Sequence, residues 1–263
     1  MSAMTSAAAT TARQRPWELA ARCGYAVSGV LHVLIGIIAV QVALGGGGES
    51  ADQSGALRQI AETPFGGIAL WVGAIALLAL AAWQAAEALR GRGEAADRAK
   101  AAGKAVVYLA LAVSAAAFAM GSGSSSEGQT EDATAGLMQA PGGRALVVAV
   151  GLGVLAVAGY HVIKGIRQKF LEDLRGVPGG QAGNAVKKAG MLGYVAKGVA
   201  LALIGFAFVV AGITSDPAQA QGLDGALHDL RDQPAGVAAL IAVGIGLACY
   251  GAYSFVRSRY ARM

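Results

Sequence analysis

The feature that most limits what this chain can fold into is a series of apolar stretches, each near the roughly 20 residues that a helix needs to cross a bilayer. Hydrophobic residues make up 55% of the 263 residues and charged residues 14%, whereas soluble domains carry about 25% charged residues. The sequence therefore predicts an all-α integral membrane bundle with six transmembrane helices, at about residues 23–44, 66–88, 104–121, 144–164, 190–213 and 235–256.

Lysine and arginine concentrate in every second connection. Of 21 such residues, three lie in the N-terminal tail, five around 90–104, seven in 164–197 and three in the C-terminal tail, whereas the other connections are mainly acidic. By the positive-inside rule we expect both termini in the cytoplasm, which requires an even number of spans. The net charge of +5 then reflects topology, and no nucleic-acid partner is expected.

One pattern occurs three times along the chain. Similar residues open the odd-numbered stretches, at Ser28-Gly29-Val30, Lys104-Ala105-Val106 and Lys197-Gly198-Val199. A proline follows 36 or 37 positions after each first residue, then a glycine two positions on, an aromatic residue 19 positions after the proline, and a charge four positions later. These residues are Pro64, Gly66, Trp83 and Glu87; Pro141, Gly143, Tyr160 and Lys164; and Pro234, Gly236, Tyr253 and Arg257.

This register predicts three parallel two-helix repeats, at residues 17–90, 91–170 and 171–263, in a pseudo-threefold arrangement within a single membrane domain. Residues 1–16 are predicted to form a disordered tail. Each proline is expected in the first turn of an even-numbered helix, where its missing N–H has no intrahelical partner. The 19-residue spacing corresponds to about 29 Å of helix, which places the aromatic residue at the opposite interface.

Small residues and the outer connections give two further expectations. Ten and twelve positions after the prolines, all three copies have alanine or glycine: Ala74 and Ala76, Gly151 and Gly153, and Gly244 and Gly246. Small residues near the membrane midplane predict close helix contacts. The acidic stretches before the prolines, such as 223–233, are expected to form short amphipathic helices at the outer surface.

With these residues in view, the chain resembles the bacterial membrane family called domain of unknown function 1206. The resemblance covers nearly the whole chain and rests on the pairs Gly24-Tyr25 and Gly193-Tyr194, the Gly-Val steps after Ser28 and Lys197, and the Pro-x-Gly entries of the even helices. The second repeat departs from it, with Lys100-Ala101 at the position of the Gly-Tyr pair. The resemblance implies three two-helix units and supplies no catalytic or binding residue.

His32 is the most informative polar residue, because it lies about 15 Å into the membrane, where an ionisable group is by default a functional hypothesis. Its repeat equivalents are Tyr108 and Leu201. One hypothesis is that the three positions line a central axis and that His32 carries a proton or binds an ion. The alternative, which we favour, is a neutral imidazole hydrogen-bonded between helices.

Glu87 is the single acidic residue within the apolar stretches. It could pair with Lys104 or Lys197, or with the cations at its own repeat position, in a charge cluster at the inner side. The alternative, again favoured, is that these long side chains reach into the headgroups. Cys23 and Cys249 are expected to be small buried apolar residues.

No motif for catalysis, cofactor binding or metal binding is recognisable. Gly151-Leu152-Gly153 lies inside a membrane stretch with no preceding strand, so it predicts packing and not a nucleotide loop. We therefore expect a non-enzymatic structural, assembly or accessory subunit, with the lipid bilayer and a membrane protein or a second copy as partners. A channel or transporter for a small solute or ion along the pseudo-threefold axis is the alternative hypothesis.

Overall fold

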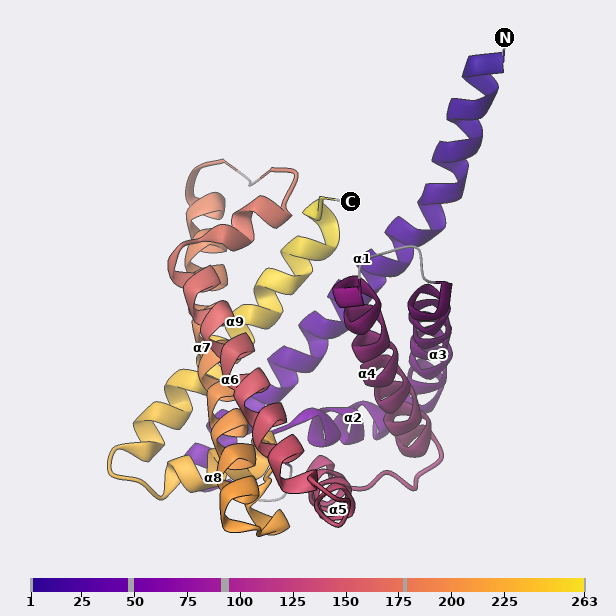
Figure 1. Ribbon diagram of the computed structural model, residues 1–263. Helices are drawn as coiled ribbons and strands as arrows, with labels where there is room; N and C mark the ends of the chain where they lie inside the picture. Colours follow the sequence, from indigo (N-terminus) through magenta and orange to yellow (C-terminus); the bar gives the residue numbers. More distant parts are fainter. Residues whose placement is uncertain (1, 47–49, 91–94, 177–178, 263) are drawn as a thin grey trace. The chain divides into compact units, whose positions relative to one another are not determined.

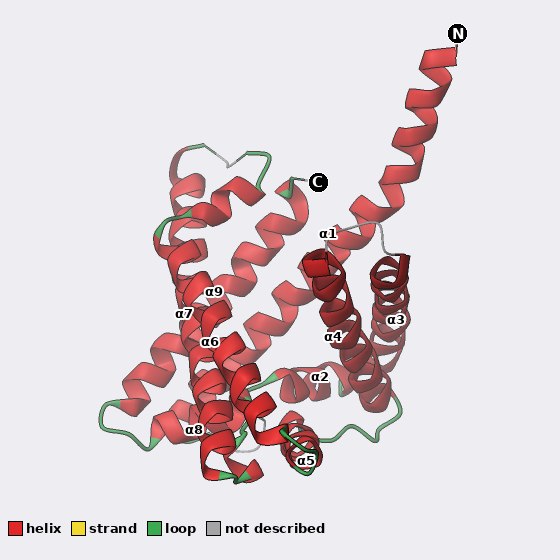
Figure 2. Ribbon diagram, viewed as in Figure 1, coloured by secondary structure: helices red, strands yellow, loops and turns green. Residues whose placement is uncertain are grey.

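A computed structural model gives the fold, and it describes the backbone of residues 2–46, 50–90, 95–176 and 179–262. Side chains are described from Arg22 onward, except at residues 90 and 96. The described residues form helices and loops without a strand (Figure 2). The elements are α1 (Ser2–Ala43), α2 (Gln53–Ala61), α3 (Gly66–Arg90), α4 (Ala95–Ala119), α5 (Ser126–Met138), α6 (Gly143–Ile166), η1 (Lys169–Asp173), α7 (Gly180–Thr214), η2 (Pro217–Gln219), α8 (Leu223–Arg231) and α9 (Gly236–Tyr260) (Figure 1).

Six of these helices are long and apolar enough to cross a membrane, which confirms the predicted membrane architecture. Within the described residues the candidate spans are Arg22–Ala43, Gly66–Leu89, Asp97–Ala119, Gly143–Ile166, Gly180–Thr214 and Gly236–Tyr260. Helix α1 includes residues 2–16, which the sequence predicts as a disordered tail. This stretch is rich in alanine, the residue with the highest helix propensity.

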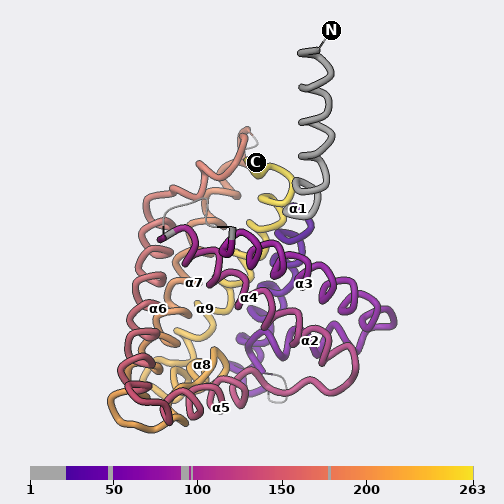
Figure 3. The backbone as a smooth tube through the Cα atoms, turned by 45° about the vertical axis from the view of Figure 1, so that its right-hand side comes forward, coloured from indigo at the N-terminus to yellow at the C-terminus, as the bar shows by residue number. Residues whose placement is uncertain are grey.

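The chain divides into two compact units. Unit 1 comprises Met1–Asp52 and Thr130–Met263, and unit 2 comprises Gln53–Gln129. In unit 1, α6 packs along α7, α1 packs along α9, and α7 also contacts α9 (Figure 3). In unit 2, α3 packs along α4, and α2 contacts both. The pseudo-threefold arrangement, which would relate helices of both units, stays a prediction.

The closest helix pairs of each unit join different repeats, because each contains an even-numbered span of one repeat and an odd-numbered span of another. In unit 1 these pairs meet through small residues that recur every seven positions on α1 and on α7, a spacing that keeps them on one helix face. They are Gly29, Gly36 and Ala43 on α1, and Gly198, Gly205 and Gly212 on α7. The repeat places Ala105, Ala112 and Ala119 at the same positions of α4, where Ala112 is buried.

The two pairs of unit 1 cross at equivalent glycines. A Cβ atom on Gly36 would lie 2.5 Å from the carbonyl oxygen of Gly244, and one on Gly205 would lie 3.0 Å from the carbonyl oxygen of Gly151. Only glycine permits this approach of the two backbones. The predicted midplane contacts are confirmed for Gly151 and Gly244, and Ala74 is buried in unit 2.

Of the residues twelve positions after the prolines, only Gly246 makes the predicted close helix contact. A Cβ atom on Gly246 would collide with Ala196 of α7, so this glycine makes the expected close contact. Ala76 is exposed, and a Cβ atom on Gly153 would meet nothing within 4 Å.

The two cysteines are less buried than predicted, because Cys23 is exposed and Cys249 is half-buried.

The Pro-x-Gly sequences form tight turns, and the prolines are not in the helices that follow. Helices α3, α6 and α9 begin two residues after the proline, at the glycine. Each glycine N–H donates to the carbonyl oxygen three residues earlier, at 2.8–2.9 Å, so the proline occupies the second position of a four-residue turn. The expected place of the prolines in the first helical turn is therefore wrong by two residues.

The glycine of each turn is required by a close backbone approach. A Cβ atom on Gly66, Gly143 or Gly236 would collide with the carbonyl oxygen of the residue six positions earlier, at the end of the preceding short helix. The short helices α2, α5 and α8 form where the acidic stretches predict helices, and their place at the outer surface stays a prediction. In α2 and α8 the repeat extends to the buried Gly-Ala-Leu sequences at 55–57 and 225–227.

Candidate functional site

His32 lies on α1 and is half-buried in unit 1. Its Nδ1 atom is 2.8 Å from the backbone carbonyl oxygen of Ser28, one turn earlier on the same helix. Its ring contacts Tyr250 of α9, with the ring centroids 4.7 Å apart. The imidazole is thus hydrogen-bonded within its own helix and packed against the neighbouring helix, whereas the favoured expectation was a hydrogen bond between helices.

Lys197 of α7 reaches the same tyrosine. Its Nζ atom lies 4.3 Å from the centroid of the Tyr250 ring, within the range of a cation–π interaction. Among the described residues it makes no ion pair. Tyr250 therefore joins His32 of α1 and Lys197 of α7 at the place where three spanning helices meet.

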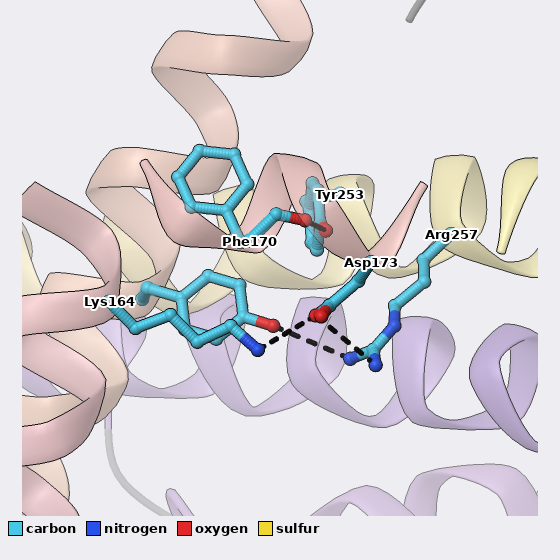
Figure 4. Close-up of polar contacts among 6 residues, drawn as sticks. Lys164, Phe170, Asp173, Tyr253 and Arg257 are labelled. Carbon is cyan, nitrogen blue, oxygen red and sulfur yellow. Dashed lines mark hydrogen bonds and ion pairs between the residues drawn. The ribbon is translucent and has the colours of Figure 1, made fainter. Parts of the chain in front are cut away.

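A second polar group, the basic-end network of Lys164, Asp173, Tyr194 and Arg257, lies near the ends of α6 and α9 (Figure 4). Asp173 of η1 accepts at its Oδ2 atom from Lys164 Nζ at 2.8 Å and lies 3.3 Å from Arg257. The Arg257 guanidinium also donates to the Tyr194 hydroxyl at 3.4 Å. The three charged side chains are 14–24% exposed, so this network is only partly open to its surroundings.

Backbone and aromatic contacts hold Asp173 in place. The Arg262 N–H donates to the Asp173 carbonyl oxygen at 2.8 Å, and the Arg175 N–H donates to the Tyr260 carbonyl oxygen at 2.8 Å. The neighbouring Phe170 is fully buried, and its backbone carbonyl accepts a hydrogen bond from the Tyr253 hydroxyl at 2.7 Å. The segment after α6 is thereby fixed to the C-terminal end of α9.

Asp173 is not among the residues that the sequence predicts to be functional. The available signal was its charge, because Asp173 and its neighbour Glu172 are the acidic residues in the otherwise basic segment 164–197. The acid that Lys164 and Arg257 contact is therefore Asp173.

Each of the two helix pairs of unit 1 contains an equivalent contact between a cation and a tyrosine ring. Arg257 of α9 lies over the ring of Tyr25 on α1, 4.4 Å from its centroid. Lys164 of α6 lies 5.5 Å from the ring centroid of Tyr194 on α7. Each pair thus joins the Gly-Tyr tyrosine of an odd-numbered span to the repeat-position cation of an even-numbered span.

In unit 2 both members of this contact are replaced together. The pair α3–α4 has Glu87 at the cation position and Ala101 at the tyrosine position. Glu87 and Lys104 are exposed, and no ion pair joins them among the described residues. Tyr108 is half-buried on α4, and its place on a common axis with His32 stays a prediction.

The opposite end of unit 1 contains an acidic clamp. Asp224 of α8 accepts a 2.6 Å hydrogen bond from the N–H of Ala51, which follows α1, and lies 3.5 Å from His228. Desolvation raises the pKa of the Asp224 carboxyl, an effect that the Ala51 hydrogen bond partly opposes and nearby Asp52 reinforces. The loop after α1 is thus tied to α8.

The described residues contain no group of three or more His, Cys, Asp or Glu side chains that could hold a metal ion. In unit 1, Lys164, Lys197 and Arg257 contact aromatic rings, and Lys164 and Arg257 also pair with the Asp173 carboxylate. The Ser28 hydroxyl lies 3.4 Å from the His32 Nδ1 atom on the same helix. This arrangement can join helices and bind ions.

Comparisons with known proteins agree with the threefold repeat. The profile of a family described as "Domain of Unknown Function (DUF1206)" matches residues 23–91, 99–168 and 192–261. A Bacillus subtilis (strain 168) protein named "Uncharacterized protein YxxB" is 29% identical over 260 residues, covering 95% of this chain and 93% of the relative. No solved structure matches. The three matches coincide with the three repeats, and the chain belongs to the DUF1206 family.

Proposed function

We propose that the protein is a non-enzymatic structural or accessory subunit of the bacterial cytoplasmic membrane, with both termini in the cytoplasm. In this role its buried polar groups hold its own helices together, and its outer helix faces bind lipid and other membrane proteins. The basic connections, which by the positive-inside rule favour the cytoplasmic side, support this orientation.

The proposal rests on the contacts that ionisable side chains of unit 1 make with aromatic rings of neighbouring helices. His32 and Lys197 contact the Tyr250 ring, and Arg257 contacts the Tyr25 ring, each across a helix–helix interface. Glycines beside them bring the backbones within contact distance. Side chains used in this way favour tight packing, whereas a transporter is expected to place polar groups around a path near the midplane.

A channel or transporter is the second candidate, and one observation favours it. His32 and Lys197 are ionisable groups on spanning helices, and such residues commonly mark ion or proton pathways. In this alternative Tyr250 would lie between His32 and Lys197, two ionisable positions along an ion pathway through unit 1.

Reconstitution into liposomes separates the two candidates. The structural role predicts that proton and potassium fluxes equal those of empty liposomes, for the wild type and for His32→Ala alike. It also predicts that the tagged protein, purified in mild detergent, retains a membrane protein in fixed stoichiometry. Flux that depends on the protein and is lost in His32→Ala would replace the structural role by transport.

A further inference from the structure

The basic-end network carries more positive charge than the described part of the protein balances. Lys164 and Arg257 share one carboxylate oxygen of Asp173, which leaves this trio with a net charge of +1. The Arg257 Nε atom is buried and has no hydrogen-bond partner among the described residues. Unbalanced charge near a membrane is costly, so an anion would stabilise this group.

The two cations lie near the ends of two candidate spans, where lipid headgroups are expected. Lys164 is two residues from the end of α6, and Arg257 is three residues from the end of α9. Their side chains are 14% and 22% exposed, so an anion can reach them from outside. Tyr160 is 58% exposed next to Lys164, and aromatic side chains of this kind favour the membrane interface.

An apolar surface continues from the cations along α6. Ile163 and Ile166 are 51% and 62% exposed on the last turn of the helix. An anion attached to an acyl chain would contact this surface and the cations together. A free anion would gain only the charge interaction, so the geometry favours a lipid.

From these three observations we propose that the basic end of unit 1 binds the phosphate of an anionic phospholipid between Lys164 and Arg257, with an acyl chain along the end of α6. A guanidinium suits this ligand because its N–H fork matches phosphate oxygens. Phosphatidylglycerol fits the net charge of +1, whereas phosphatidylcholine contains the same phosphate without net charge.

Native mass spectrometry of the full chain tests this site directly. The protein in detergent is mixed with phosphatidylglycerol or phosphatidylcholine, and the lipid retained per protein is counted. Because a basic residue near an anionic surface contributes on the order of 1 kcal/mol, Lys164→Gln should lower phosphatidylglycerol retention by about fivefold. The control Lys187→Gln/Lys188→Gln, which removes two exposed charges from the start of α7, should retain lipid as the wild type does.

Three results would overturn the proposal. Equal loss in the control would show that diffuse positive charge attracts the lipid, and equal retention of both lipids would remove the role of the net charge. Displacement of the lipid by inorganic phosphate would identify a free-anion site. Should Lys164→Gln aggregate, Asp173→Asn decides, because it keeps both cations and should increase phosphatidylglycerol retention.

Discussion

At the scale of single residues, Lys164, Lys197 and Arg257 on the spanning helices of unit 1 each contact an aromatic ring. The sequence identified the cations at the repeat positions and the tyrosines of the Gly-Tyr pairs, but as two unrelated features. It could not show that Tyr25 meets Arg257 or that Tyr194 meets Lys164, because the partners are far apart in the chain. Asp173 escaped prediction because it lies outside the repeated positions.

Asp173 should contribute to stability through its two cationic partners. Asp173→Asn leaves Lys164 and Arg257 without a counter-charge, and we expect a loss of about 1–2 kcal/mol because the group is partly exposed. Thermal unfolding in detergent measures this loss. Glu172→Gln is the matched control, since Glu172 is exposed and adjacent. Equal unfolding temperatures for the two variants would contradict the role of Asp173.

Asp224 should make the acidic clamp respond to pH. Burial raises its pKa above the unfolded value, so its contribution to stability is fully present below the unfolded pKa and is lost as pH rises through the folded pKa. Relative to the wild type, Asp224→Asn should therefore be most stabilising at neutral pH, and the difference should shrink toward pH ~4. The comparison uses thermal unfolding across this pH range.

The neighbours of Asp224 define the control for this experiment. Asp52 and His228 face the carboxyl group and remain in both proteins. Asp229→Asn removes an exposed acid on the same helix and should not reproduce the pH-dependent difference. A difference between Asp224→Asn and the wild type that grows on acidification would show that the sign is wrong.

At the scale of elements, the spans agree with their sequence-based boundaries because hydrophobicity and the repeat mark the same residues. Helix α9 was expected at about 235–256 and spans Gly236–Tyr260. The exceptions are the odd-numbered spans, expected from about residues 23, 104 and 190, whose helices α1, α4 and α7 begin at Ser2, Ala95 and Gly180. Hydropathy identifies membrane segments, not the helical turns that extend beyond them.

Two glycine substitutions of opposite sign test the helix pairing. Gly36→Ala places a Cβ atom 2.5 Å from the Gly244 carbonyl oxygen and should destabilise the protein by about 1–3 kcal/mol. A Cβ atom on Gly159 of α6 would meet nothing within 4 Å, so Gly159→Ala should stabilise by up to about 1 kcal/mol through helix propensity. Stabilisation by both, measured by thermal unfolding, would contradict the close α1–α9 contact.

The turn before α9 gives a further pair of opposite changes. Ala235 has a φ of +63°, and its repeat equivalent Gly142 has a φ of +77°. Glycine adopts this conformation without strain, so Ala235→Gly should stabilise by about 1 kcal/mol and Gly142→Ala should destabilise by a similar amount. Thermal unfolding of both variants checks the signs, and a destabilising Ala235→Gly would argue against the positive φ.

At the scale of the whole molecule, the repeated segment and the packed pair are different units. The sequence correctly predicted three two-helix repeats, and the family matches fall on them. The closest pairs, however, join spans of different repeats, and α1–α9 joins the two ends of the chain. Hydropathy and local spacing cannot show this pairing, because each pair depends on contacts between residues that are distant in sequence.

We infer that His32 is packed between α1 and α9 and does not contact a water-filled path. We would test it by placing cysteine at residue 32 in a background without Cys23 and Cys249, and labelling membranes with a charged, impermeant thiol reagent. Arg259→Cys, at an exposed position near the end of α9, serves as the labelled control. The account predicts labelling at 259 and none at 32 from either side of the membrane; rapid labelling at 32 would contradict it.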